Sequence, residues 1–201
     1  MSSIKNTKTT PIVAEYIDEC ASQYFTQEEK DTIEELSNVQ EFKKGDIIIR
    51  EGQHVKTCYH VIKGCLRQYK SVDGEERTIA FYTEDDSLLS MSTYKSSYIS
   101  KFDVECMEAC TLSVMTAENE REMYKRFPKI ESISRMSLEQ MIKENQERFA
   151  DFMISNPEER YLNLIEKRPG LLTRIPQYHL ASFLGIKPES LSRIRKRLAQ
   201  K

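Results

Sequence analysis

The residues with the clearest chemical potential lie near the C-terminus, where a short cationic helix is expected to follow a glycine. The stretch Gln177–Leu198, QYHLASFLGIKPESLSRIRKRL, has apolar or small residues at helical spacing on both sides of Gly185. We interpret it as two short helices that cross steeply, with Ala181 allowing close approach and Gly185 tolerating a positive φ in the turn. The second helix carries carboxylate, hydroxyl and guanidinium groups away from its apolar side. Such groups suit base edges and phosphates in the major groove of DNA.

Catalytic chemistry has little support in the sequence. The motifs G-x-S-x-G, H-E-x-x-H, G-x-x-x-x-G-K and G-x-G-x-x-G are all absent from it. His54 and His60 could share a site with Cys58, but separate surface or core histidines are more typical of this arrangement. His179 lies far away in the cationic stretch. We therefore predict a protein that is not an enzyme and that binds no metal.

The cysteines do not form a recognisable framework. Five are present, and no two of them form a C-x-x-C pair, which argues against a disulfide scaffold or a zinc knuckle. We expect reduced, mostly buried thiols at Cys20, Cys58, Cys65, Cys106 and Cys110.

Charge is distributed unevenly along the 201 residues. The formal net charge is −2, yet residues 155–201 contain ten Lys or Arg against four Asp or Glu, so this part carries +6 and the preceding part −8. An acidic front with a basic tail is typical of a protein in which only the tail meets a polyanion. A solvated basic helix without a partner is the alternative that charge alone leaves open.

The beginning of the chain predicts helices rather than a targeting signal. The segment MSSIKNTKTTP lacks the apolar core of a signal peptide, and no apolar run approaches the roughly 18 residues of a membrane span. We expect a cytoplasmic protein with no membrane partner. Helical spacing over 11–24, and then a capping box of Thr26 with Glu29, indicate two lead-in helices, the second ending at Leu36.

Residues 39–116 predict an antiparallel β-domain. Runs rich in Val, Ile, Thr, Tyr and Phe alternate with turn signals that contain four of the six glycines, and Asp73-Gly74 is the strongest hairpin signal. This spacing favours a sandwich or small barrel over βαβ units. The Ser-rich interruption at 84–100 is where such a barrel could hold a small effector. Its candidate pocket residues are Ser90, Ser100 and Lys101.

A long helix is expected next, because Pro128 precedes an uninterrupted helical pattern that reaches about Ile154. Its apolar face is larger than the edge of a small β-domain can cover, so we predict that a second copy of the chain covers the remainder. Packing on its own domain is the alternative. The residues assigned to the dimer face are Ile130, Ile133, Met141 and Phe149. Asn156-Pro157 then opens a short helix that ends at Lys167.

The order of these elements resembles the Crp/Fnr family of bacterial transcription regulators over nearly the whole chain, from Phe42 to Leu198. In the β-domain the similar stretch is FKKGDIIIREGQHVKTCYHVIKGCLRQYKSVDGEERTIAFY, whose turn glycines match the family's pattern. Near the C-terminus, Glu189-Ser190-Leu191-Ser192-Arg193 resembles the E-x-x-S-R motif of the Fnr branch. The resemblance implies a homodimer that binds double-stranded DNA at a palindrome, with RNA polymerase as a further partner.

The same resemblance implies roles for single residues. Glu189 would accept a hydrogen bond from a cytosine amino group, Arg193 would donate to guanine, and Ser192 would help to discriminate a neighbouring thymine-rich step. The remaining polar residues of the second helix and its start are assigned to phosphate contacts. These are Lys187, Ser190, Arg195, Lys196 and Arg197.

Three departures from the family limit this carry-over. Members that bind cyclic AMP place a Gly-Glu pair and an Arg-Ser pair around the phosphate-binding loop, whereas this chain reads Leu88-Leu89-Ser90-Met91 and Ile99-Ser100-Lys101-Phe102. A single lysine lacks the bidentate fork of arginine, so we predict no tight binding of cyclic AMP. The Fnr branch holds an iron–sulfur cluster on clustered N-terminal cysteines, and Cys20 alone cannot replace them. The chain ends at Lys201, where most members continue into a β-hairpin wing, so it resembles a short wingless subgroup.

The sequence as a whole predicts an α+β protein in three parts. They are helices with an antiparallel β-barrel or jelly-roll sensor domain at 1–127, a long dimerisation helix at 128–155, and an all-α helix-turn-helix domain at 156–201. We predict a sequence-specific DNA-binding regulator that needs no cofactor. Two alternatives are a helix-turn-helix that binds a protein partner and an enzyme that uses the Ser-rich pocket. The identity of an effector, and the choice between activation and repression, stay open.

Overall fold

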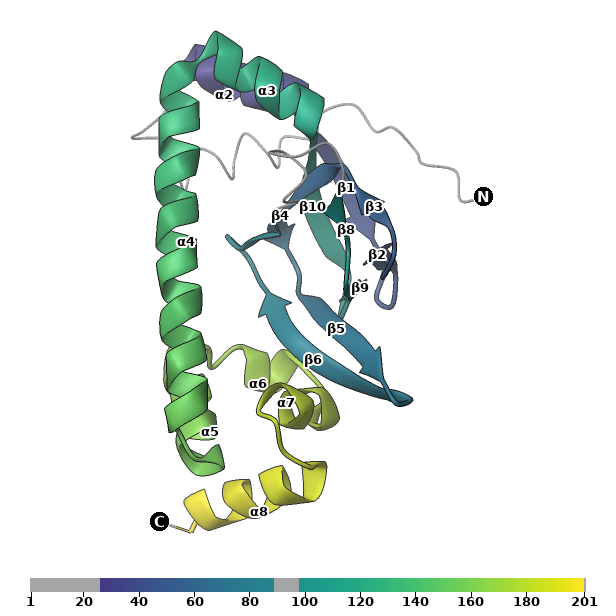
Figure 1. The fold of residues 1–201 in the computed structure, drawn as a ribbon, viewed down its shortest axis with the longest axis vertical. Helices are drawn as coiled ribbons and strands as arrows, with labels where there is room; N and C mark the ends of the chain where they lie inside the picture. The colour runs from purple at the N-terminus through teal and green to yellow at the C-terminus, as the bar shows by residue number, and fades with distance from the viewer. Residues whose placement is uncertain (1–25, 89–97, 201) are drawn as a thin grey trace. The chain divides into compact units, whose positions relative to one another are not determined.

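The structure is a computed structural model of the chain, and it describes residues 26–88 and 98–200 (Figure 1). The expected helix at 11–24, Cys20 and Ser90 lie outside the described residues. The helices and strands in chain order are α2 (Gln27–Leu36), β1 (Asn38–Phe42), β2 (Ile47–Ile49), β3 (His54–Val55), β4 (Thr57–Lys63), β5 (Leu66–Val72), β6 (Glu75–Tyr82), β7 (Ser87–Leu88), β8 (Tyr98–Ile99), β9 (Asp103–Cys106), β10 (Cys110–Thr116), α3 (Ala117–Arg126), α4 (Pro128–Ile154), α5 (Pro157–Lys167), α6 (Leu171–Arg174), α7 (Gln177–Phe183) and α8 (Pro188–Leu198).

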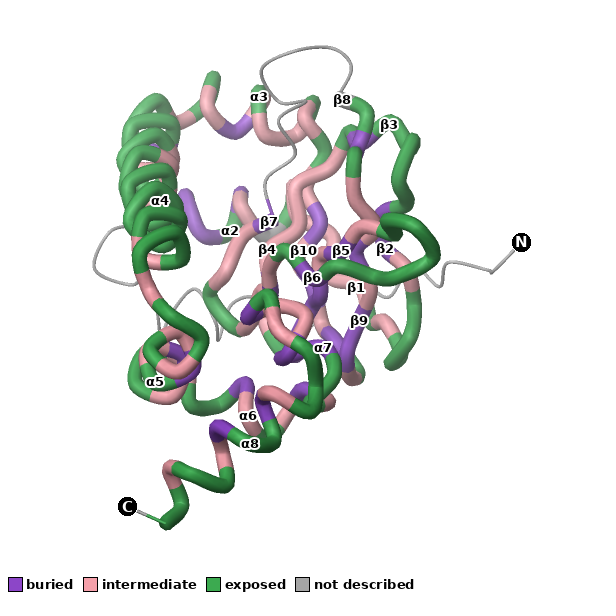
Figure 2. The backbone as a smooth tube through the Cα atoms, turned by 60° about the horizontal axis from the view of Figure 1, so that its bottom comes forward, coloured by how far each residue is buried: buried purple, intermediate pink, exposed green. Residues whose placement is uncertain are grey.

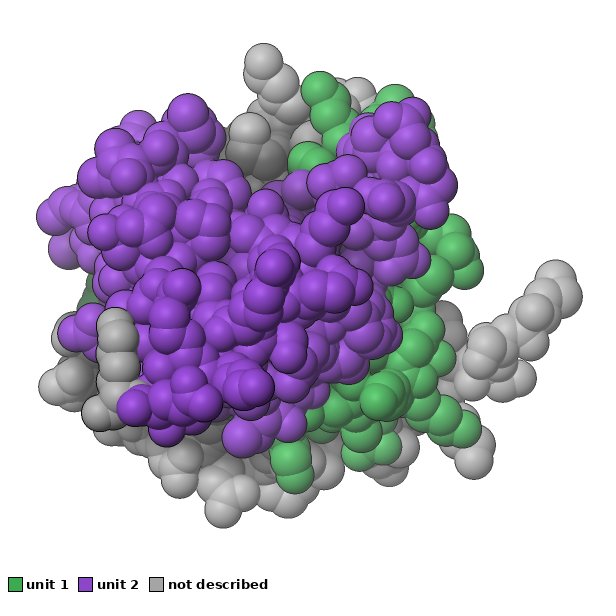
Figure 3. Space-filling model, turned by 90° about the horizontal axis from the view of Figure 1, so that it is seen from below, with its two compact units in different colours: residues 1–66, 82–132 green, residues 67–81, 133–201 purple. Residues whose placement is uncertain are grey.

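The chain divides into two compact units (Figure 3). The first contains residues 1–66 and 82–132, and the second contains residues 67–81 and 133–201. In this division the β5–β6 hairpin groups with the C-terminal helices. Helix α4 begins in the first unit and continues in the second.

The first unit is an antiparallel β-structure. Strands β1, β10, β4 and β7 pair side by side in that order, β2 pairs with β9, and β3 pairs with β8. The predicted α+β class with a jelly-roll-like domain followed by helices is confirmed. Of the two forms expected, barrel or jelly roll, the described strands do not close into a barrel, because they fall into separate sheets.

The core of the first unit follows from alternation along its strands. In β10 the side chains of Cys110, Leu112 and Val114 are buried while the residues between them are half-buried, which is the period of two expected for a half-buried strand. Each fully buried apolar side chain of this size contributes about 1.5–3 kcal/mol. The cluster comprises Ile48, Ile49, Val55, Val61, Leu66, Leu88, Val104, Cys106, Cys110, Leu112 and Val114.

Two turns explain why glycine stands where it does. Gly64 has φ +110°, and a Cβ there would lie 2.6 Å from Cys110 Sγ and 2.8 Å from Cys110 Cα, so a larger residue is excluded. Asp73 and Gly74, with φ 53° and 79°, form the two-residue turn between β5 and β6. Positive φ at both positions matches the right-handed twist of a tight hairpin. The hairpin predicted from Asp73-Gly74 is confirmed.

The helix starts were also correctly predicted. Thr26 Oγ1 accepts a hydrogen bond from Glu29 N at 3.3 Å, and Glu29 Oε2 accepts one from Thr26 N at 2.7 Å, which completes the expected capping box of α2. At α5, Asn156 makes the equivalent pair of contacts with Glu159, and Pro157 occupies the first turn. None of the described helices is long and apolar enough to cross a membrane.

Candidate nucleic-acid interface

Helices α7 and α8 of the second unit form the predicted pair around a glycine turn. Gly185 has φ +69°, and the turn is closed by hydrogen bonds from Gly185 N to Ser182 O and from Ile186 N to Ala181 O, both 3.0 Å. Ala181 is fully buried, as expected for a residue at the closest approach of two helices. A Cβ on Gly185 would lie 3.2 Å from Cζ of Phe152, so this position is constrained by backbone angle and by space.

The start of α8 has no side-chain cap. Lys187 is extended, with φ −78° and ψ 150°, and its ammonium group cannot accept from the first-turn amides. Pro188 occupies the first turn, where its missing N–H leaves no bond unmade. The positive end of the helix dipole and the exposed Lys187 therefore lie together, an arrangement that favours an anion.

One face of α8 is buried and the other is exposed. Leu191 is fully buried and Ile194 retains 7% of its exposure, so they hold the helix on its own unit. The exposed residues recur at intervals of three and four, which places them on one side of the helix. They are Pro188, Glu189, Ser192, Arg193, Lys196 and Arg197. The three residues predicted to read bases are thus brought together on one exposed face.

The residues predicted to contact phosphate have more varied surroundings. Lys187, Lys196 and Arg197 are exposed, while Ser190 and Arg195 are half-buried. Arg193 Nη2 donates to Ser190 Oγ at 3.4 Å, which ties a predicted base reader to a predicted phosphate contact. Arg197 forms an ion pair with Glu158 of α5. This carboxylate competes with a phosphate for Arg197, and no local sequence pattern indicates that competition.

Sequence reasoning also missed the side chains that hold α7 against the β5–β6 hairpin. Ser182 forms hydrogen bonds with the backbone of β6, and His179 lies buried near Arg67 and Glu76. Burial and, to a smaller extent, the positive charge of Arg67 lower the pKa of His179, Glu76 opposes both effects, and the net pKa is about 4. These residues are about a hundred positions apart in the chain, so no local pattern connects them.

The candidate effector residues are not gathered into a polar pocket by the part of the chain that the structure describes. Ser100 is 5% exposed, and its Oγ donates to Phe102 O at 2.7 Å and accepts from Phe102 N at 3.2 Å. Its hydroxyl is therefore used inside its own turn. Lys101 is exposed, and Ser90 lies outside the described residues. Neither described residue supplies the bidentate fork that suits the phosphate of a cyclic nucleotide.

Helix α4 is mostly exposed (Figure 2), and its predicted dimer residues divide into two groups. Ile130 is 3% exposed within its own chain, so it serves the packing of the first unit rather than an exposed face. Ile133 and Met141 are half-buried, whereas Phe149 is 68% exposed. Ile142 and Met153 are also exposed, at 49% and 67%, and lie on the same side of the helix as Phe149. The exposed apolar stripe is therefore centred on Phe149 and not on the start of α4.

The buried thiols lie in the β-structure of the first unit. Cys65, Cys106 and Cys110 are buried and Cys58 is half-buried, which confirms the expectation of mostly buried cysteines for these four. A hydrogen bond between the side chains of Cys106 and Cys110, together with burial, raises the pKa of Cys106. Among the described residues, no three His, Cys, Asp or Glu side chains are grouped closely enough to hold a metal.

Comparison with known proteins finds one family model that the β-domain matches. Residues 39–127 match the family model of the cyclic nucleotide-binding domain. The matched range contains β2 to β10, including the β5–β6 hairpin of the second unit, and all of β1 except its first residue. None of the curated proteins matches the chain.

Several solved structures share the fold over most of the chain. The c-di-GMP responsive global regulator CLP of Xanthomonas campestris has 16% identity and a TM-score of 0.69, covering 87% of this chain and 92% of that one. FixK2 of Bradyrhizobium japonicum has 14% identity and a TM-score of 0.71, with coverages of 82% and 85%. The catabolite activator protein of Thermus thermophilus has 20% identity and a TM-score of 0.55, with coverages of 88% and 85%. The resemblance to Crp/Fnr regulators is thus confirmed at the level of the fold.

Proposed function

We propose that this protein is a sequence-specific DNA-binding transcription regulator of the Crp/Fnr type, and that α7 and α8 form its helix-turn-helix. One observation carries the proposal: α8 buries Leu191 and Ile194 and exposes Glu189, Ser192 and Arg193 along one side. The major groove of B-DNA is wide enough to admit an α-helix, and the base edges there present distinct donors and acceptors. The combined carboxylate, hydroxyl and guanidinium groups then have partners of the right chemistry.

Base reading would be divided among these three side chains. Arg193 would donate two hydrogen bonds to guanine, Glu189 would accept from a cytosine amino group, and Ser192 would help to select a thymine-rich step. Because each good bidentate contact discriminates by about 1–3 kcal/mol, Arg193 should contribute most to the choice of base. The hydrogen bond from Arg193 to Ser190 keeps the guanidinium over α8 before DNA arrives.

Phosphate contacts would fix the position of α8 without selecting a sequence. Lys187 and Ser190 at the start of the helix, and Arg195 with Lys196 further along, surround the base-reading face. Each cation that reaches a phosphate releases counterions, so affinity should fall steeply with salt. Arg197 joins them only after leaving Glu158.

The homodimer would form along α4. Ile142, Phe149 and Met153 expose apolar surface on one side of this helix, and a second α4 offers the same stripe by symmetry. Two α8 helices in a dimer would meet half-sites about 34–36 Å apart, which predicts a palindromic site. As a regulator of transcription, the dimer would meet RNA polymerase at the promoter. We propose that it needs neither cyclic AMP nor another cofactor, since the Ser100 hydroxyl bonds within its own turn and Lys101 lacks the bidentate fork of arginine.

Two arginine variants test the assignment. Arg193→Ala should weaken binding to the preferred duplex by about 1–3 kcal/mol and relax the choice of base at one position. Arg197→Ala should weaken binding to all sequences similarly and lower the salt slope by about one. Fluorescence anisotropy with the preferred duplex and a scrambled duplex, at several salt concentrations, separates the two effects. Equal losses on both duplexes for Arg193→Ala would refute its role as a base reader, and binding without any salt dependence would favour a protein partner for α8.

A further inference from the structure

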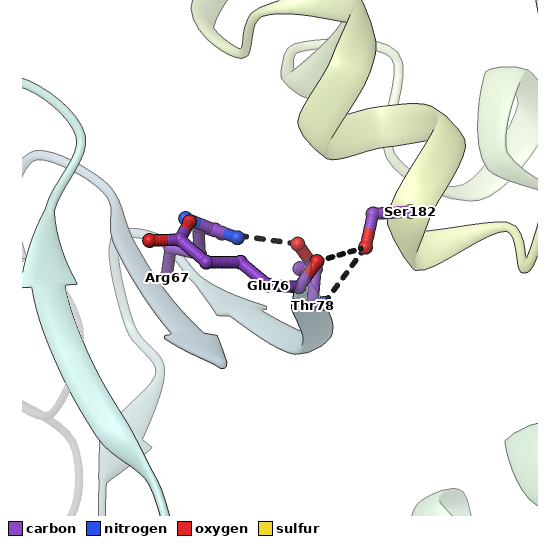
Figure 4. Close-up of polar contacts among 4 residues, drawn as sticks. All are labelled: Arg67, Glu76, Thr78 and Ser182. Carbon is purple, nitrogen blue, oxygen red and sulfur yellow. Dashed lines mark hydrogen bonds and ion pairs between the residues drawn. The ribbon is translucent and has the colours of Figure 1, made fainter. Parts of the chain in front are cut away.

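A single hydroxyl joins α7 to the backbone of β6 inside the second unit (Figure 4). Ser182 Oγ accepts a hydrogen bond from Thr78 N at 2.9 Å and donates one to Glu76 O at 3.1 Å. Residues two apart in a strand direct their backbone groups to the same side, and β6 is the last strand of its sheet. Ser182 thus supplies the donor and the acceptor that a further strand would provide, and it covers an edge that would otherwise be open.

The same two residues of β6 are held from within the hairpin by a buried cation. Arg67 of β5 is 1% exposed, and its Nε donates to Thr78 Oγ1 at 3.0 Å while Nη1 donates to Glu76 Oε2 at 2.7 Å. Its guanidinium lies 4.3 Å from the ring centre of Tyr69. Charge-assisted hydrogen bonds of this kind are shorter and stronger than neutral ones. Arg67 therefore fixes the positions of the two β6 residues that Ser182 contacts.

Two further contacts extend the junction along β6. The rings of Phe81 and Phe183 meet edge to face, with centroids 5.3 Å apart. Arg168, at the end of α5, donates from Nη1 to Phe81 O at 2.9 Å. The hairpin thus contacts α7, which follows α6 in sequence, and Arg168, which precedes α6. We call this set of contacts the β6 junction, made by Glu76, Thr78, Phe81, Arg168, Ser182 and Phe183.

The β6 junction leaves the reading face of α8 uncovered. All of its helical contacts come from α7 and the end of α5, while Glu189, Ser192 and Arg193 remain exposed. Docking on β6 therefore holds the helix pair without masking it. We propose that Ser182 is a positioning residue for DNA binding, and that the α7–α8 pair reads DNA while docked on β6. This inference rests on the proposed function. It adds that the β5–β6 hairpin positions the α7–α8 pair through Ser182.

Reciprocity of coupled equilibria gives a direct test in the wild-type protein. If DNA binds the docked pair more tightly than the undocked pair, DNA must in turn stabilise the docked state. The Thr78 amide reports that state because its proton is held by Ser182 Oγ. Hydrogen exchange at Thr78 should slow when a duplex recovered from a random-sequence pool is added to the full chain. Unchanged or faster exchange at this amide would overturn the proposal.

Substitutions at Ser182 then separate positioning from mere folding. Ser182→Ala should weaken binding to the selected duplex by about twofold to tenfold, which is the range for losing one such hydrogen bond, without a change in salt slope. It should also abolish the effect of DNA on Thr78 exchange, while Ser182→Thr keeps both properties. Ser132→Ala is the matched control, because Ser132 is exposed on α4 and its Oγ donates to Pro128 O of its own helix.

The controls keep this proposal distinct from the function on which it rests. If Arg193→Ala loses specific binding while Ser182→Ala binds as the wild type does, the proposed function stands and the positioning role of Ser182 is refuted. If the wild-type protein binds no duplex at all, the proposed function itself is refuted and the positioning role with it.

Discussion

Acid should weaken the second unit through a single histidine. His179 of α7 is 6% exposed, and the charged groups that face it are Arg67 and Glu76 of the hairpin. Its burial disfavours the imidazolium, the Arg67 guanidinium disfavours it further, and the Glu76 carboxylate offsets part of this, which leaves a pKa of about 4. The native protein therefore keeps His179 neutral at pH values where an unfolded chain would protonate it.

The sign and size of the effect follow from proton linkage. In the unfolded chain His179 should titrate near 6.5. Between pH 6.5 and 4 the unfolded state binds more protons than the native state, so the free energy of unfolding falls as the pH falls through this window. At 1.36 kcal/mol per pKa unit, the difference between the unfolded and native pKa of His179 corresponds to about 3 kcal/mol of unfolding free energy. This contribution is fully present above pH 6.5 and is lost by about pH 4.

Urea unfolding of the wild type and of His179→Gln, followed by circular dichroism between pH 7 and 4, measures this contribution. Glutamine carries no charge in this range. On acidification from pH 7 to 4, the free energy of unfolding of the variant should therefore fall by about 3 kcal/mol less than that of the wild type, because the contributions of all other titrating groups cancel in the difference. His54→Gln, a substitution of an exposed histidine in the first unit, is the control. Parallel stability profiles for wild type and His179→Gln would show that the reasoning about the buried imidazole is mistaken.

Three further predictions address DNA binding, assembly and the effector. Glu158→Gln should release Arg197 and raise affinity for random duplex DNA about twofold to fivefold; unchanged affinity would mean that Glu158 does not compete with phosphate for Arg197. Phe149→Glu should convert a dimer to monomers in analytical ultracentrifugation, whereas the control Lys143→Glu, elsewhere on α4, should not; an unchanged sedimentation coefficient would argue against the α4 stripe. Calorimetry should detect no tight cyclic AMP binding, and affinity in the low micromolar range would contradict that expectation.

Features encoded by neighbouring residues could be predicted from the sequence. The capping box at Thr26, the Asp73-Gly74 turn and the Gly185 turn each depend on a few adjacent positions whose chemistry has one favoured conformation. The exposed side of α8 was predictable for the same reason, because helical periodicity decides which residues lie opposite the buried Leu191 and Ile194.

Features that depend on distant contacts could not be predicted. The bond between Thr78 and Ser182 joins positions 104 residues apart, and neither residue belongs to a pattern that identifies the other. Ile130 shows a related difficulty, since helical periodicity indicates that an apolar face is covered but not whether its own chain or a second copy covers it. The ion pair of Arg197 with Glu158 likewise joins two helices that only the tertiary structure brings together.

The central claim is that a dimer reads DNA through the exposed face of α8. Selection of duplexes from a random-sequence pool by the purified full chain, followed by sequencing, tests it most directly. We predict enrichment of a palindrome whose half-sites lie one helical turn apart and contain a G·C pair that Arg193→Ala no longer requires. Failure to enrich any sequence, or enrichment of a site without two-fold symmetry, would contradict the account.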